Sequence, residues 1–129
     1  TLSETGNVPT DATPKAMPFY NAFKKRWGVP PRSTGCVSAY ESLYVLKDAI
    51  ERADSLDDDA LIKALEETRL PAVRGTIRFD KNHQIIYGYD PNEAVLGCWV
   101  QWQDGKRVQI FPEAAAMGKL KMPPWLAGK

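Results

Sequence analysis

The sequence has few of the residues on which enzymes and metal proteins depend. It contains one histidine, His83, and two cysteines, Cys36 and Cys98, which stand far apart. Two isolated cysteines and one histidine match no zinc-ligand spacing, and no flanking pattern indicates a nucleophile with its base. The glycines are also isolated, so no glycine-rich loop is available to hold a phosphate. The sequence therefore predicts no catalytic residue, no metal site, no cofactor and no enzymatic activity.

A strong charge of one sign and long hydrophobic runs are missing as well. Seventeen Lys and Arg residues face sixteen Asp and Glu residues, which gives a net charge of +1. This balance creates no field that would attract nucleic acid or an anionic membrane. No run of about 18 apolar residues is present to span a bilayer, and the chain begins at Thr1 without Met or an apolar leader. We expect a soluble protein without a nucleic-acid partner, cut from something longer.

Length and composition indicate a single globular unit. The chain has 129 residues, of which 43% are hydrophobic and 26% are charged, and these values are ordinary for a folded domain. Cys36 and Cys98 are compatible with one disulfide in an oxidising compartment. Two buried thiols are the favoured alternative.

A first helix is predicted over residues 14–27. Its last turn carries three cations, which favour the negative end of a helix, and Gly28 followed by Pro30 ends it. We interpret the cations as a solvated helix end rather than a phosphate site. The apolar side chains at helical spacing are Ala16, Tyr20, Phe23 and Trp27.

A second helix is predicted to begin at Ser38 and to run to residue 53. Ser38 and Glu41 have the spacing of a capping box, in which the hydroxyl and the carboxylate each accept a hydrogen bond from a free backbone N–H. Tyr40 and Tyr44 widen its apolar face, so we expect the helix to be well buried. The predicted inner face consists of Ala39, Leu43, Leu46, Ile50 and Ala53.

A third helix follows the acidic residues 57–59, which favour a helix N-terminus. These aspartates lack the alternation with a turn glycine that a calcium loop needs, so no metal is predicted there. The expected inner face consists of Leu61, Ile62, Leu65 and Thr68.

After Pro71 the sequence pattern changes from helical to extended. Alternating residues predict a strand at 76–80, a turn around His83 and a second strand at 84–89. Asp104-Gly105 predicts a type I′ hairpin turn between strands at 94–103 and 106–111, with both faces at least partly covered. A helical turn is expected at 113–117, followed by an extended tail held by Trp125.

Five motifs in this order resemble the periplasmic solute-binding proteins of branched-chain amino-acid ABC transporters. The first three are helical: a Phe-rich helix ending at Gly28, a helix that starts with Tyr-Glu-Ser at residues 40–42 and ends with Ala-Ile-Glu-Arg-Ala at 49–53, and an acidic start to the next helix. The last two are extended: a Gly-x-x-x-Phe-Asp strand at 75–80 and a Gln-Trp-x-x-Gly-Lys hairpin from residue 101. Glu-Ser replaces the commoner Asp-Ala of the family. The resemblance covers essentially the whole chain.

The resemblance implies an α/β fold in which this chain is the C-terminal segment of a two-lobed protein, with three helices followed by strands and a β-hairpin. Residues 1–35 would supply a helix segment of the second lobe, residues 36–79 a helix pair of the first lobe, and residues 80–129 strands, hairpin and tail of the second lobe. The fragment would therefore contain parts of both lobes.

The resemblance also implies a function. The solute would be a branched-chain or related amino acid or amide, bound as the two lobes close about a hinge, and Val37, Ser38 and Tyr40 are the candidate ligand-binding residues. Tyr40 is also favoured because a capped helix N-terminus can present N–H groups to an anion. Most of the other aromatic residues have the helical spacing that is typical of side chains packed in a core. Partners would be the remainder of the polypeptide and an ABC permease. The location would be periplasmic, or extracytoplasmic with a lipid anchor.

Two other classes of function remain. The same fold serves in ligand-sensing receptors and amide-responsive regulators, which a regulated operon would favour over neighbouring permease and ATPase genes. A small enzyme would need a reactive thiol at Cys36 or Cys98, which a fast alkylation rate at neutral pH would reveal.

Overall fold

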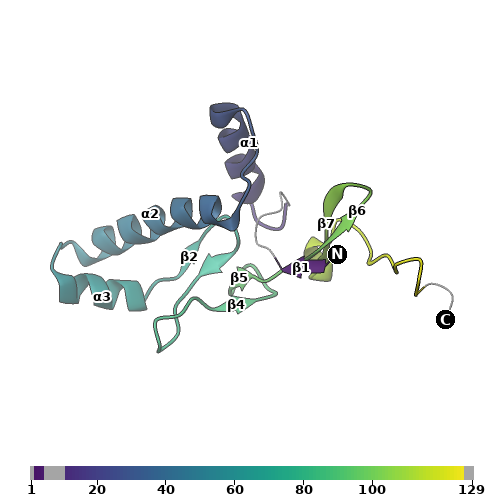
Figure 1. The fold of residues 1–129 in the computed structure, drawn as a ribbon. Coiled ribbons are helices and arrows are strands. Elements are labelled where there is room, and N and C mark those ends of the chain that lie inside the picture. The colour runs from purple at the N-terminus through teal and green to yellow at the C-terminus, as the bar shows by residue number, and fades with distance from the viewer. Residues whose placement is uncertain (1, 5–10, 127–129) are drawn as a thin grey trace.

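The computed structural model describes residues 2–4 and 11–126. Figure 1 shows an elongated molecule in which α2 and α3 lie side by side, α1 rises from the start of α2, and a β-hairpin occupies the other end. The elements are β1 (Leu2–Glu4), α1 (Ala16–Trp27), α2 (Thr34–Ala53), α3 (Asp58–Glu66), β2 (Leu70–Pro71), β3 (Thr76–Ile77), β4 (Tyr87–Gly88), β5 (Val95–Leu96), β6 (Trp99–Gln103), β7 (Lys106–Phe111) and the 3₁₀ turn η1 (Glu113–Ala115).

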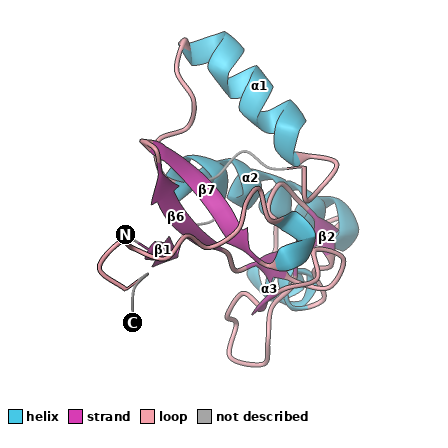
Figure 2. Cartoon of the chain, turned by 90° about the vertical axis from the view of Figure 1, so that its right-hand side faces the viewer, coloured by secondary structure: helices cyan, strands magenta, loops and turns pink. Residues whose placement is uncertain are grey.

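The strands form three small sheets rather than one large sheet. The hairpin β6–β7 is extended by β1 to a three-stranded antiparallel sheet, β2 pairs with β3 antiparallel, and β4 pairs with β5 in parallel. Seen from the hairpin end, α1 projects beyond the hairpin and α2 lies behind it (Figure 2). Three helices with small strand pairs confirm the expected partial α/β fold.

The described residues bury their apolar side chains in separate clusters. One joins α1, the start of α2 and the β2–β3 turn, a second joins α2 to the short strands, and a third lies in the hairpin. Their buried members are Ala16, Phe19, Tyr20, Val37 and Val73 in the first, Val45, Ala72, Ile77 and Val95 in the second, and Cys98 and Val100 in the third. Each cluster is small compared with the continuous core of a typical domain.

The first helix forms as its local signals predict. Gly28 has a φ of 72°, and its backbone N–H donates to the Lys24 carbonyl at 2.9 Å, which ends α1 in the left-handed conformation that glycine adopts readily. At the other end, the Thr13 hydroxyl accepts from the Ala16 N–H at 3.1 Å and donates to the Val73 carbonyl at 2.7 Å. This hydroxyl ties the start of α1 to the β2–β3 turn.

The predicted capping box at Ser38 is wrong. The N-cap of α2 is Ser33, five residues before Ser38, so Ser38 lies inside the helix and its carbonyl accepts from the Ser42 hydroxyl. Glu41 turns inward and binds Arg74 instead of capping the helix. A tertiary partner for the carboxylate has therefore replaced the local hydrogen bond that the spacing suggested.

The predicted inner face of α2 is wrong for three of its five residues, since only Ile50 and Ala53 are half-buried. Leu43 is 69% exposed and Leu46 is 45% exposed, whereas Val37, Glu41, Val45 and Ala49 are buried. α2 carries apolar residues on nearly every side, so periodicity could not decide which side packs. In this structure the Val45 side of α2 is the buried one, because it packs in the second cluster.

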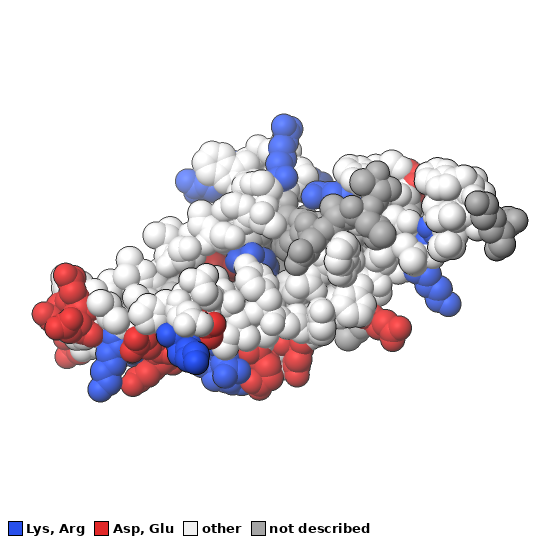
Figure 3. Space-filling view, turned by 60° about the horizontal axis from the view of Figure 1, so that its bottom comes forward, with Lys and Arg blue, Asp and Glu red and all other residues white. Residues whose placement is uncertain are grey.

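The third helix starts as predicted, because the Asp57 side chain accepts from the Ala60 N–H at 3.2 Å. Thr68 is buried and Leu65 is partly buried, but Ile62 is 50% exposed, so the predicted inner face is only partly correct. Acidic side chains gather at the end of the molecule where α2 leads into α3 (Figure 3).

The hairpin at Asp104-Gly105 is confirmed. Gln103 pairs with Lys106, and both turn residues have positive φ values, 51° and 75°, as a type I′ turn requires. The preceding strand, turn and strand form only in part, because Phe79 and Ile85 make a single bridge and β4 pairs with β5 instead.

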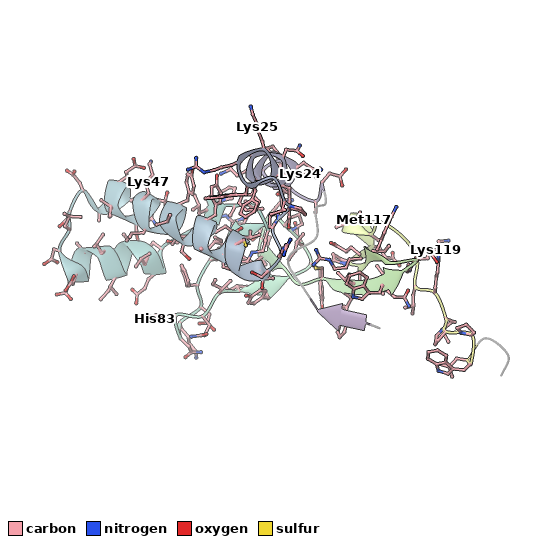
Figure 4. All side chains as sticks on the ribbon, turned by 45° about the horizontal axis from the view of Figure 1, so that its top comes forward. Lys24, Lys25, Lys47, His83, Met117 and Lys119 are labelled. Atoms are coloured by element: carbon pink, nitrogen blue, oxygen red, sulfur yellow. The ribbon has the colours of Figure 1, made fainter. Side chains whose placement is uncertain are left out.

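The C-terminal tail is held by hydrogen bonds from two glutamine side chains of β6 to its backbone rather than by Trp125, which is 76% exposed. The Gln101 side chain donates to the Lys121 carbonyl at 2.8 Å and accepts from the Lys121 N–H at 2.9 Å, and Gln103 donates to the Lys119 carbonyl. Figure 4 shows Lys119 beside the hairpin. The expectation of a tail anchored by its tryptophan is therefore wrong.

Cys36 is a half-buried thiol and Cys98 a buried one, with no disulfide between them. Within residues 2–4 and 11–126, no helix has the length and apolar character to cross a bilayer.

Candidate functional site

Tyr40 lies in the wall of a groove between α1 and α2. The groove has a volume of about 630 Å³, and the β2–β3 turn closes one side of it. Aromatic rings form part of its apolar wall, and rings of this kind give large contact areas at low conformational cost. The aromatic residues are Phe19, Phe23, Trp27, Tyr40 and Tyr44.

The rings form a continuous series across the two helices. Tyr40 stands 4.9 Å from Phe19 and 4.8 Å from Tyr44, measured between ring centroids. Phe19 continues the series along α1 to Phe23 at 6.0 Å, and Phe23 continues it to Trp27 at 6.3 Å. A hydrogen bond with Tyr44 raises the pKa of the Tyr40 phenol. The series is therefore uncharged; Phe19 within it is buried, whereas Trp27, Tyr40 and Tyr44 are exposed.

The charged side chains at the groove already have partners. Lys15 donates to the Pro71 carbonyl at 2.8 Å, and the Arg26 guanidinium lies 5.3 Å from the Trp27 ring centroid. Glu41 is 3% exposed and pairs with Arg74. A zwitterionic solute in this groove would therefore find apolar contacts here, but its ammonium group would need a carboxylate from elsewhere, because Glu41 is already paired.

The structure does not bring the three predicted ligand residues to one surface. Val37 has no exposed surface and packs with Phe19 and Val73. Ser38 is half-buried on another side of α2, while Tyr40 is 41% exposed and lines the groove. Only Tyr40 reaches the groove, and a ligand-binding role for the three residues remains a prediction.

The true N-terminus of α2 lies at Ser33 and not at Ser38, so the backbone N–H of Tyr40 is not one of its first, unpaired donors. The Ser33 hydroxyl lies 3.8 Å from the Cys36 sulfur, and this contact lowers the pKa of the thiol. The Ser33-Thr34 sequence after two prolines was an available signal for this helix start.

Sequence reasoning missed two features of the groove. Phe23 and Trp27 were placed among the apolar residues of α1 and Phe19 was given no role, although the three together describe a continuous aromatic edge. The Glu41–Arg74 pair joins residues 33 positions apart, and no local pattern could identify it. The only indication of the pair in the sequence was a glutamate among the apolar residues of a helix that was expected to be buried.

Comparison with known proteins identifies the chain's relatives. The profile of a family described as periplasmic binding protein matches residues 2–91. Leu/Ile/Val-binding protein homolog 7 of Brucella melitensis is 32% identical over 120 residues, which are 90% of this chain and 28% of that protein. Leu/Ile/Val-binding protein homolog 8 of Brucella abortus is 30% identical over 118 residues, again 28% of that protein.

Solved structures agree with the sequence matches. A putative branched-chain amino acid ABC transporter from Silicibacter pomeroyi has a TM-score of 0.82 at 25% identity, over 97% of this chain and 35% of that one. The leucine-binding protein LivK from Thermotoga maritima has a TM-score of 0.66 at 26% identity, over 84% of this chain and 29% of that one. The chain thus spans about a third or less of these proteins. Because the family profile covers more than half of its residues, this chain belongs to the periplasmic binding protein family.

Proposed function

We propose that this chain is the C-terminal part of a solute-binding protein that delivers a branched-chain or related amino acid to an ABC permease. The main support is the match to Leu/Ile/Val-binding proteins over 90% of the chain. The aromatic groove adds apolar surface, and an aliphatic side chain is recognised by burial of such surface. The family implies a place outside the cytoplasm.

Residues 1–35 and 80–129 would belong to the second lobe and residues 36–79 to the first. This division follows the resemblance to the family and not the packing, because two of the buried clusters cross its boundaries: Phe19 packs with Val37, and Val45 with Val95. Within this proposal, solute binding selects a closed arrangement of the lobes, and the closed form docks on the permease.

Most of the solute site would lie outside this chain. Glu41, the acidic residue that lines the groove, is already paired with Arg74, so the ammonium of an amino acid would be bound by other residues of the complete protein. Tyr40 would contribute an apolar wall with a hydroxyl at its edge. Ser38 and Val37 are the weaker candidates, because they are less exposed.

Calorimetry tests the split site. The 129-residue chain, titrated with leucine, isoleucine and valine, should show no measurable binding. Micromolar affinity of the chain alone would contradict a site divided between this segment and others.

A hybrid protein tests the function itself. This chain replaces the matched segment of the Brucella melitensis Leu/Ile/Val-binding protein homolog 7, and leucine binding is measured after cooperative unfolding has shown that the hybrid folds. We expect binding, and Tyr40→Ala should weaken it about tenfold, as loss of one buried aromatic contact would. Tyr87→Ala, at a site that is 61% exposed and outside the groove, is the matched control. A folded hybrid that binds none of the three amino acids would refute the proposal.

A further inference from the structure

The charged residues that line the groove between α1 and α2 are two cations and one carboxylate. They are Lys15, Arg26 and Glu41. The Glu41 side chain is 3% exposed and lies 2.7 Å from the Arg74 guanidinium, so its charge is already neutralised. Residues 12–40 contain no Asp or Glu but five Lys and Arg residues. The described residues of the groove therefore present positive charge without a free carboxylate, and such a surface attracts an anion.

Arg26 is placed to bind that anion. At 3.6 residues per turn, Phe19, Phe23 and Arg26 fall within about 60° of the circumference of α1, and all three line the groove. In the described part of the chain Arg26 forms no ion pair, and its guanidinium lies 5.3 Å from the Trp27 ring centroid. A guanidinium that stacks on a ring keeps N–H groups at its edge, where they can donate two parallel hydrogen bonds to a carboxylate.

The wall beside Arg26 offers aromatic rings that a ligand can reach. Phe23 is half-buried, and Trp27, Tyr40 and Tyr44 are exposed. A ligand ring can make stacked or edge contacts with such side chains in addition to burying apolar area, whereas an aliphatic chain only buries area. The groove volume of about 630 Å³ has room for a ring with a short chain.

The same charges disfavour an amino acid at this position. The carboxylate of an amino acid could bind Arg26, but its ammonium group would find only cations and uncharged rings, because Glu41 is already paired. An ion that loses water without gaining a partner of opposite charge weakens binding. The groove therefore favours an anion that carries no ammonium group.

We propose that the groove between α1 and α2 is a binding site for an aromatic carboxylate, whose carboxylate binds the Arg26 guanidinium and whose ring contacts Phe23 and the two tyrosines of α2. This inference goes beyond the proposed function. The chain binds such a ligand by itself, whereas an amino-acid solute needs residues outside the chain. The two kinds of binding can therefore fail separately.

Calorimetric titration of the 129-residue chain with three ligands of similar shape tests the charge preference. Hydrocinnamate carries a ring and a carboxylate, hydrocinnamamide has a neutral amide in place of the carboxylate, and phenylalanine adds an ammonium group to hydrocinnamate. We expect hydrocinnamate to bind with a dissociation constant of about 0.1–1 mM, as its size allows. The amide and phenylalanine should each bind about tenfold more weakly or less.

Arg26→Gln tests the anion-binding residue. This variant should bind hydrocinnamate about tenfold more weakly and the amide nearly as before, so the preference for the acid disappears. Lys25→Gln is the matched control, because Lys25 does not line the groove and points outward from α1 (Figure 4). It should change both affinities less than about twofold. Damage to the fold would weaken both ligands alike, so the ratio of the two affinities separates recognition from misfolding.

Hexanoate tests the aromatic part of the proposal. It has a carboxylate and an apolar chain but no ring, and it should bind about fivefold more weakly than hydrocinnamate. Tyr44→Leu keeps apolar surface but removes a ring, so it should reduce this difference. Tyr87→Leu, at a side chain that is 61% exposed outside the groove, is the matched control and should leave the difference unchanged.

Absence of hydrocinnamate binding, equal affinities for the acid and the amide, or equal weakening by Lys25→Gln would each overturn the proposal. Hexanoate binding as tight as that of hydrocinnamate would refute the preference for a ring. The hybrid protein described above is titrated with hydrocinnamate in the same way. Loss of binding in the folded hybrid would show that the rest of the polypeptide fills the groove, which would also overturn the proposal. Leucine binding by the hybrid tests only the proposed function.

Discussion

The Glu41 carboxylate is bound on three sides by Arg74. It accepts from the Arg74 backbone N–H at 2.9 Å and from Nε at 2.8 Å, and a second guanidinium nitrogen lies 2.7 Å away. The Glu41 side chain is 3% exposed and that of Arg74 is 11% exposed. The Arg74 carbonyl in turn accepts from the Leu96 N–H at 2.8 Å. One residue of the β2–β3 turn thus connects α2 to β5.

Arg74→Met should destabilise the chain by about 3 kcal/mol, because it leaves the Glu41 carboxylate buried without its cation. The change is measured as the free energy of unfolding in urea. Arg69→Met is the matched control, since Arg69 pairs with Glu93 at 2.7 Å but both side chains are about half exposed. We expect that control to cost less than about 1 kcal/mol. Equal losses in the two variants would show that burial of the Glu41–Arg74 pair is unimportant.

Gly75→Ala should destabilise the β2–β3 turn by about 3 kcal/mol. Gly75 has a φ of 129°, and an added Cβ would lie 2.2 Å from the Ala94 carbonyl oxygen, a backbone atom that cannot move aside easily. Gly28→Ala separates backbone strain from this clash, because Gly28 has a φ of 72° with open space around it. Its cost should be about 1 kcal/mol. Thermal unfolding of both variants measures the difference, and a Gly75 variant as stable as the Gly28 variant would contradict the close approach.

Tyr20 should make stability depend on pH in the alkaline range. Burial, with a smaller contribution from Cys98, raises the pKa of its phenol to about 12, whereas a tyrosine in an unfolded chain titrates near 10. Between these values the unfolded chain releases a proton that the native chain retains, so the contribution is present below pH 10 and is lost as the pH rises toward 12.

Urea unfolding of the unmodified chain and of Tyr20→Phe, at several pH values from 9 to about 12, measures this contribution. The unmodified chain should lose stability more steeply than the variant, since other titrating groups are common to both. Parallel pH profiles would show that Tyr20 titrates normally in the folded protein.

Local signals in the sequence correctly predicted the elements that local interactions stabilise. Gly28 ends α1, Asp57 caps α3, and Asp104-Gly105 turns the hairpin, because each depends on backbone groups within a few residues. The five ordered motifs also indicated the family that the profile match confirms. The assignment of chain segments to two lobes, and the ligand role of Tyr40, remain predictions.

Tertiary structure alone decided which side of α2 is buried and where Glu41 points. The helix is apolar almost all round, so its periodicity was satisfied equally by a buried Val45 side and a buried Leu43 side. The spacing of Ser38 and Glu41 predicted that the Glu41 carboxylate would cap the helix. In the structure this buried carboxylate instead accepts a hydrogen bond from the positively charged side chain of Arg74. Contacts between residues far apart in the sequence determine which side of the helix is buried and which group the carboxylate binds, because the local sequence is compatible with either arrangement.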